Sequence, residues 1–208
     1  MNFSELKAEF FDRGFNYLEE DASDVARAER WLNQAYREIL NLQAWPFLQA
    51  TVTGASGAGF ANVPDLRRVR YVTDVSQTSG TAPGRQLVRV SLDDLVAEGY
   101  DLTSTGAPDY YYIVGGNAVY GYRLGGTIRV DYFKRVAPMS GTDEPVFDEE
   151  YHNLIVDKAV IKAYIDSDNF EGAQALQATT DAGLSAMAED FQIESRDLQF
   201  IRVDPYDG

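Results

Sequence analysis

Apolar residues in the first 45 positions recur every three or four residues, a spacing that predicts two amphipathic helices. The first has Ser4 as its expected N-cap and ends near Gly14. The second begins after Asp21 or Ser23 and ends before Trp45-Pro46, because proline disfavours helix in the preceding residue. Its apolar face is wider than one partner helix needs and includes Trp31, Tyr36 and Leu40.

From Pro46 to about Pro138 the pattern alternates between apolar and polar residues, which predicts an antiparallel β region of five or six strands. In residues 67–75, Val69, Tyr71, Thr73 and Val75 are expected on one face. The glycine-rich segment 54–59 lacks the Lys-Ser/Thr of a phosphate loop and is interpreted as a mobile turn. Expected strands cover 47–53, 67–75, 86–90, 110–114, 118–122 and 127–134, with a short helix at 91–99.

The C-terminal region is helical again. A helix capped by Asp148 carries apolar residues almost all round, including Ile155, Val160 and Tyr164, which indicates burial on most sides. A second helix is expected from Phe170 to about Phe191, and residues 192–208 are expected to be an extended tail. The predicted fold class is α+β, with a helical core from 1–45 and 146–191, an inserted β-rich region at 46–145 and a C-terminal arm at 192–208.

Charge is unevenly distributed along the chain. Its 18 basic and 33 acidic residues give a net charge of −15, and residues 146–208 alone carry −10. A field of this sign repels phosphate backbones and argues against sequence-specific nucleic-acid binding, although an acidic surface also simply favours solubility. No apolar run is long enough to cross a membrane and no signal segment follows Met1, so we expect a soluble protein made in the cytoplasm.

The sequence contains no recognisable catalytic set. It has no cysteine, which excludes thiolate chemistry and cysteine-ligated metals, and its single histidine is His152. We expect His152 to be a helix-surface or interface residue, because no serine nucleophile signature lies near it. The prediction is a protein that is not an enzyme and needs no cofactor.

Two acidic segments leave cation binding open. Asp166 and Asp168 begin like a calcium loop, but Glu171 stands where that loop needs glycine, so an interhelical turn capped by Asp168 or Asn169 is favoured. The carboxylates of 143–150 gather where a helix begins, where the helix dipole favours negative charge.

Tyrosines at 110–112, 120, 122 and 132 leave a carbohydrate-binding or carbohydrate-acting protein as an alternative, since such rings can line a sugar groove. In an antiparallel sheet they more often cover a half-buried face or an interface. A pair of glycosidase carboxylates also stays open from sequence alone.

Several short motifs, taken in order, resemble the head–tail adaptor proteins of tailed bacteriophages. The early helix RWLNQAYREIL followed by Trp-Pro-Phe resembles the opening of that family. The later features follow in the family's order. The matching segments are Arg30–Leu40, Trp45–Phe47, Gly106–Tyr111, Arg129–Phe133 and Phe147–Ala159.

The resemblance implies a structural virion protein that forms a ring of about twelve copies joining the portal to the tail or neck, with DNA passing through its channel without specific binding. Expected partners are the portal ring, tail, stopper or neck proteins and other copies of the chain, at the head–tail junction of the virion. A stopper or tail-terminator protein is the alternative within this class. Expected interface residues are Trp31, Tyr36, Leu40, Ile155, Val160, Tyr164, Leu198, Phe200, Ile201 and Val203. The last four suit an arm that adds a strand to a partner.

Overall fold

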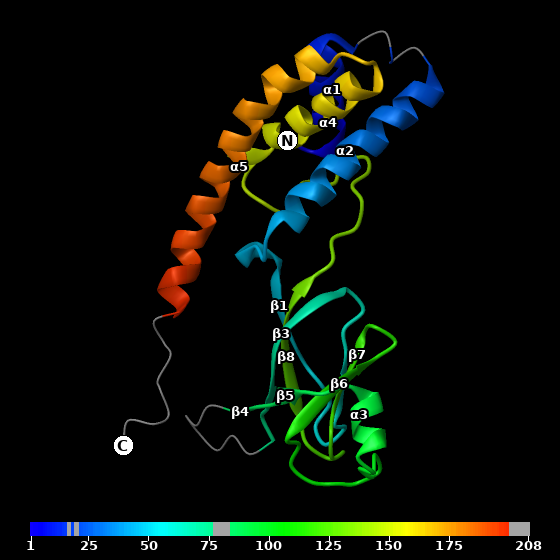
Figure 1. Cartoon of the computed structure of the whole chain (residues 1–208), viewed down its shortest axis with the longest axis vertical. Helices are drawn as coiled ribbons and strands as arrows, with labels where there is room; N and C mark the ends of the chain where they lie inside the picture. The colour runs from blue at the N-terminus through cyan, green and yellow to red at the C-terminus, as the bar shows by residue number, and fades with distance from the viewer. Residues whose placement is uncertain (16–17, 19–20, 77–83, 200–208) are drawn as a thin grey trace. The chain divides into compact units, whose positions relative to one another are not determined.

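The computed structural model describes residues 1–15, 18, 21–76 and 84–199, the last eight of these by their backbone only. The chain divides into two units (Figure 1). A helical unit contains Met1–Phe47 and the chain from Ala137 onward, and a β unit contains Leu48–Val136. The predicted α+β class is confirmed.

The N-terminal part of the helical unit consists of α1 (Phe3–Phe10), a π-helical turn η1 (Phe11–Phe15) and α2 (Ala22–Leu42). The cap of α1 is Asn2 rather than the predicted Ser4. Asn2 and Glu5 form a reciprocal capping box, and Ser4 instead donates to the Gly141 carbonyl at 2.8 Å. Asp21 caps α2 as expected, by accepting from the Ser23 amide at 2.7 Å.

The C-terminal part consists of a 3₁₀ turn η4 (Glu149–Tyr151), α4 (Asn153–Asp166) and α5 (Phe170–Gln199). Helix α4 contacts α1, α2 and α5 (Figure 1), which explains why it is apolar on most sides. Gly183 permits the close approach of α5, since a Cβ there would lie 2.6 Å from a methyl carbon of Leu154. Asp148 precedes η4 but makes no side-chain cap hydrogen bond.

Helix α5 continues to Gln199, whereas the sequence pattern places its end near Phe191 and an extended tail from 192. Residues 192–199 contain no proline or glycine, so nothing in their backbone chemistry stops a helix that is already formed. The rest of the predicted arm, 200–208, lies outside the described residues.

The β unit follows a 3₁₀ turn η3 (Pro46–Leu48), and its described residues form eight strands in two four-stranded sheets, more strands than predicted. Their orders are β1-β8-β3-β4 and β2-β7-β6-β5. The predicted hairpin corresponds to β6 and β7, but β5 runs parallel to β6. The strands are β1 (Gln49–Thr53), β2 (Phe60–Asn62), β3 (Leu66–Asp74), β4 (Arg85–Gln86), β5 (Val88–Arg89), β6 (Tyr110–Val114), β7 (Ala118–Gly121) and β8 (Ile128–Lys134).

The predicted strand 86–90 is split between the two sheets. Leu87 is buried and donates its amide to Val72 at 2.8 Å, in the sheet of β3 and β4. Val90 donates to Tyr111 at 2.9 Å, in the other sheet. The chain therefore passes from one sheet to the other at Leu87. The alternation of apolar and polar residues over five positions cannot reveal such a change of sheet.

The predicted face of residues 67–75 is also altered. Register shifts occur between Leu66 and Arg68 and between Val69 and Tyr71. Val72 and Asp74 are buried as a result, although Val72 was assigned to the face opposite Val69 and Tyr71.

The glycine-rich segment 54–59 is held by backbone hydrogen bonds rather than being a free turn. Gly54 donates to Ile128 and Gly59 to Gly126, both at 2.9 Å. A Cβ on Gly54 would lie 2.1 Å from the Phe60 carbonyl oxygen, so only glycine fits there.

The core of the β unit contains side chains from both sheets, with Val72, Val119, Ile128 and Val130 fully buried. A second cluster joins Leu95 of α3 (Leu92–Ala97) to Tyr112 and Tyr122. Ser91 caps α3 as the sequence predicts.

The segment 137–145, expected in the β region, belongs to the helical unit. Asn33 of α2 explains this placement, because its amide bonds both backbone groups of Met139. Its Oδ1 accepts from the Met139 amide at 2.7 Å, and its Nδ2 donates to the Met139 carbonyl at 3.0 Å. Within the described ranges, no helix combines the length and hydropathy needed to span a membrane.

Candidate functional site

The expected interface residues of α2 lie mostly inside the helical unit. Tyr36 and Leu40 are buried, and the Tyr36 hydroxyl accepts from the Val146 amide at 3.1 Å. Burial raises the pKa of the Tyr36 hydroxyl. Trp31 is half-buried, with its ring 6.0 Å from that of Phe10. Of these three side chains, Trp31 therefore has the exposed surface that a neighbour needs.

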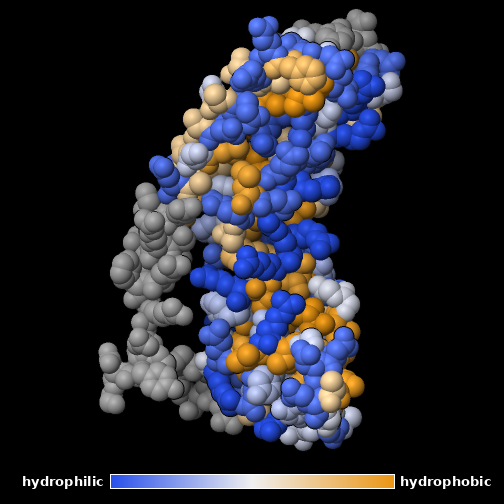
Figure 2. All heavy atoms as spheres, viewed as in Figure 1, coloured by the Kyte–Doolittle hydropathy of each residue, from blue (hydrophilic) through white to orange (hydrophobic). Residues whose placement is uncertain are grey.

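The expected interface residues of α4 are likewise partly buried and partly accessible. Ile155 and Val160 are buried, while Tyr164 is half-buried against Phe15, at 5.4 Å between rings. Val160 and Tyr164 line a groove of about 520 Å³ together with Arg13 and residues of α5. On the face shown in Figure 2, hydrophilic and apolar residues are interspersed.

The remaining expected residues belong to the C-terminal segment. The backbone of Leu198 lies in α5, while Phe200, Ile201 and Val203 lie outside the described residues. The assignment of these ten residues to an interface stays a prediction.

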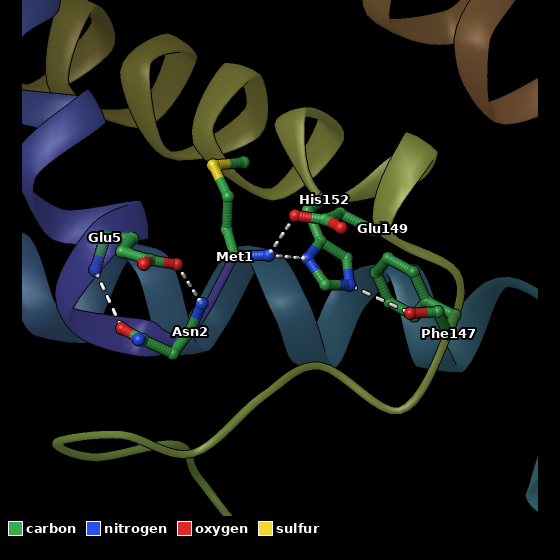
Figure 3. A network of polar contacts seen from close by, with 6 residues as sticks. All are labelled: Met1, Asn2, Glu5, Phe147, Glu149 and His152. Atoms are coloured by element: carbon green, nitrogen blue, oxygen red, sulfur yellow. Dashed lines mark hydrogen bonds and ion pairs between the residues drawn. The ribbon is translucent and has the colours of Figure 1, made fainter.

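His152 is buried with 4% exposure, not on the helix surface. Figure 3 shows both of its ring nitrogens engaged: Nδ1 lies 2.9 Å from the Met1 amino group and Nε2 lies 2.9 Å from the Phe147 carbonyl oxygen. The Met1 amino group also pairs with Glu149 at 2.9 Å and lowers the pKa of that carboxyl. A histidine with both nitrogens occupied joins elements of the helical unit and lacks a free nitrogen to act as a base.

The calcium-like segment is an interhelical turn. Asp168 adopts φ +59°, and Asn169 accepts from the Gly172 amide at 3.0 Å. Asp166 lies 3.7 Å from Arg27 of α2. Over the part of the chain that the structure describes, no three histidine or carboxylate side chains are grouped as metal ligands.

The tyrosines of the β unit pack mainly against one another. Tyr112, Tyr120 and Phe60 form a stack with ring centroids 5.5 and 5.4 Å apart. Tyr111 belongs to the core between the sheets, and Tyr132 donates to Asp65 at 2.8 Å. These contacts account for the tyrosine content of the β unit by packing.

The two units differ strongly in net charge. Residues 48–136 contain nine basic and eight acidic residues, a net charge of +1. The helical unit contains nine basic and 25 acidic residues, a net charge of −16. The uneven charge distribution along the sequence therefore follows the division into two units.

A groove of about 440 Å³ in the β unit has two arginines in its lining. Arg70 and Arg89 line it with Tyr71, Gln86, Leu87, Val88 and Tyr111. Sequence analysis missed this feature, because the arginines are 19 positions apart and belong to different sheets. The excess of arginine between residues 67 and 89 was the sequence signal that could have indicated a basic groove.

A family model described as SU10 adaptor protein matches residues 1–201, which covers both units and nearly the whole chain. No curated protein sequence matches the chain significantly. The order of helices, inserted β unit and helices is the arrangement that the resemblance of the motifs implied. The chain belongs to the SU10 adaptor protein family, a family of phage head–tail adaptor proteins.

Proposed function

We propose that the chain forms a ring at the head–tail junction of the virion, where it joins the portal ring to tail, stopper or neck proteins and surrounds the passage for DNA. The observation that carries this proposal is the match of the adaptor family over residues 1–201. An adaptor acts by binding, so the proposed role needs no catalytic group or cofactor.

The net negative charge of the helical unit supports the proposal that DNA passes through the ring. A net charge of −16 repels phosphates, and a passage with such walls lets DNA slide without being held. Attraction would instead retain DNA at each basic contact.

Exposed apolar side chains of the helical unit support contacts with other proteins. Ile165 and Phe170, beside the α4–α5 turn, are 50% and 63% exposed, and Leu42 is 57% exposed. We assign contact roles to the half-buried Trp31 and Tyr164 and to the predicted arm residues Leu198, Phe200, Ile201 and Val203. The buried Tyr36, Leu40, Ile155 and Val160 act on the interface through the fold of the helical unit.

Co-sedimentation with the portal ring encoded in the same genome tests the proposal, with native mass spectrometry of the product. The expected result is a discrete complex with about one chain per portal subunit. A complex with tail proteins alone would contradict the portal contact and favour a stopper or tail terminator.

Deletion of 200–208 tests the arm separately, because it leaves α5 intact to Gln199. We expect the truncated chain to keep its circular dichroism spectrum and to lose portal binding. Unchanged portal binding would remove the arm from the proposal while leaving the ring.

A further inference from the structure

The arginine groove of the β unit, lined by Arg70, Tyr71, Leu87, Val88 and Arg89 among others, contains two arginines that form no ion pair with a carboxylate of the described residues. Arg89 is exposed and also lines a neighbouring pocket that contains Asp93 and Asp94. The side-chain partner of Arg70 is the neutral amide of Gln49, 2.5 Å away, and its guanidinium lies 5.5 Å from the centre of the Tyr71 ring.

Some other arginines of the same unit are paired. Arg85 and Arg123 both pair with Asp109, and Arg129 lies 2.9 Å from Asp131. Residues 77–83, between β3 and β4, contain no charged side chain at all. Arg68 and Arg135 are also exposed and form no ion pair among the described residues, so what distinguishes Arg70 and Arg89 is that both line one groove.

The groove combines charge with apolar surface. Val88 is 61% exposed, and Leu87 and Tyr111 are buried beside it. Guanidinium groups match carboxylates in a bidentate geometry, so a groove of this kind suits a protein segment that carries carboxylates beside apolar atoms.

The helical unit carries unpaired carboxylates of the required kind. The side chains of Asp148 and Glu150 are exposed and make no hydrogen bond or ion pair among the described residues. Both residues precede Tyr151, whose hydroxyl donates to Asp190. This hydrogen bond, burial and the negative charges of Asp190, Glu150 and Asp148 raise the pKa of Tyr151 to about 12, so the negative charges are concentrated here.

We propose that the arginine groove of one copy binds the Asp148–Glu150 segment of the next copy in the ring. This inference rests on the proposed ring, and the contact is heterologous, because the groove and the acidic segment are different surfaces of one chain. Charge complementarity between the two groove arginines and the exposed carboxylates of the acidic segment gives the contact its orientation. DNA is the less suitable occupant, since a chain with a net charge of −15 repels it.

Two charge-reversed variants test the contact. The groove variant is Arg70→Glu with Arg89→Glu, and the acidic-segment variant is Asp148→Arg with Glu150→Arg. Each keeps one wild-type surface and reverses the other, so neither binds itself, while in a mixture every groove meets a segment of opposite charge.

We expect the wild-type chain to assemble on the portal ring, each variant alone to assemble at least about tenfold more weakly, and the equimolar mixture to recover assembly with alternating copies. Native mass spectrometry measures the composition, and circular dichroism checks that each variant is folded. Arg68→Glu with Arg135→Glu is the matched control for the double groove variant, since Arg68 and Arg135 are exposed but do not line the groove.

The outcomes separate the two proposals. A wild-type chain that neither assembles nor binds the portal overturns the ring, and the groove contact with it. A groove variant that assembles like wild type overturns the groove contact alone, as does a mixture that does not recover assembly. If the groove variant assembles normally but is no longer retained on a DNA column, the groove binds DNA and not the acidic segment.

Discussion

The helical unit and the β unit differ in how the chain builds them and in the charge they carry. The β unit is one continuous segment with a net charge of +1, whereas the helical unit joins both ends of the chain and carries −16. The comparison teaches that the negative charge of the chain is concentrated in one unit rather than averaged over its whole length.

The cores differ too. The helical unit packs an aromatic cluster that includes Trp45, Phe47, Phe147 and Phe191, whose rings come from both ends of the chain. The β unit packs mainly aliphatic side chains between two sheets. Damage to one core should therefore reach the other unit weakly, and the following predictions test that separation.

The largest effect is expected from Trp45→Ala. Trp45 is fully buried, and its Nε1 donates to the Ile39 carbonyl at 2.8 Å. Its loss should lower the free energy of unfolding of the helical unit by about 3–5 kcal/mol, measured by urea denaturation followed by circular dichroism. Trp31→Ala is the matched control, and an equal cost for the half-buried Trp31 would contradict the assignment of Trp45 to the core.

Gly54→Ala is expected to damage the β unit instead. The added Cβ meets the Phe60 carbonyl oxygen, so β1 and β2 must separate at a cost of about 1–3 kcal/mol. Hydrogen exchange should show faster exchange in the β unit and unchanged exchange in α4. Ser56→Ala, at an exposed position of the same turn, should change neither; loss of protection in α4 would show that the units are coupled.

A smaller effect is expected at the start of α1. Asn2→Ala removes the side-chain acceptor for the Glu5 amide, 3.0 Å away, and should cost about 1 kcal/mol in a thermal unfolding experiment. Asn2→Ser, which also caps helices well, should recover most of the loss. If Ser4→Ala alone destabilised the helical unit while Asn2→Ala did not, Ser4 would be the more important residue.

The smallest effect is a difference in tyrosine titration. Burial and the hydrogen bond to Asp65 raise the pKa of Tyr132 in the β unit to about 12. The pKa of Tyr151 in the helical unit is raised to about 12 first by its hydrogen bond to Asp190. Because both values lie above the ordinary value of 10, the stability each tyrosine contributes is present below pH 10 and lost as pH rises towards 12.

Salt should separate these two tyrosines. Exposed carboxylates contribute to the shift of Tyr151, so 1 M salt should lower its pKa more than that of Tyr132. Ultraviolet titration of Tyr151→Phe and Tyr132→Phe assigns the two steps. Equal salt sensitivity would mean that the carboxylates around Tyr151 contribute nothing.

The sequence by itself determined the order of elements and the family. The apolar spacing of the second helix, the short helix at 91–99 and the strands at 110–114 and 118–122 are local signals, and each of these elements forms. The family motifs are likewise short segments of contiguous residues, so they are readable without a fold.

Tertiary structure decided what depends on distant partners. The chain changes sheets at Leu87 because the Leu87 amide donates to Val72 in one sheet and the Val90 amide donates to Tyr111 in the other. His152 is buried because the Met1 amino group and Phe147 contact its ring. The grouping of Arg70 with Arg89 in one groove arises in the same way. Periodicity reports which face of a segment is apolar, but what covers that face depends on side chains far away in the sequence, so burial and grouping appear only in the folded chain.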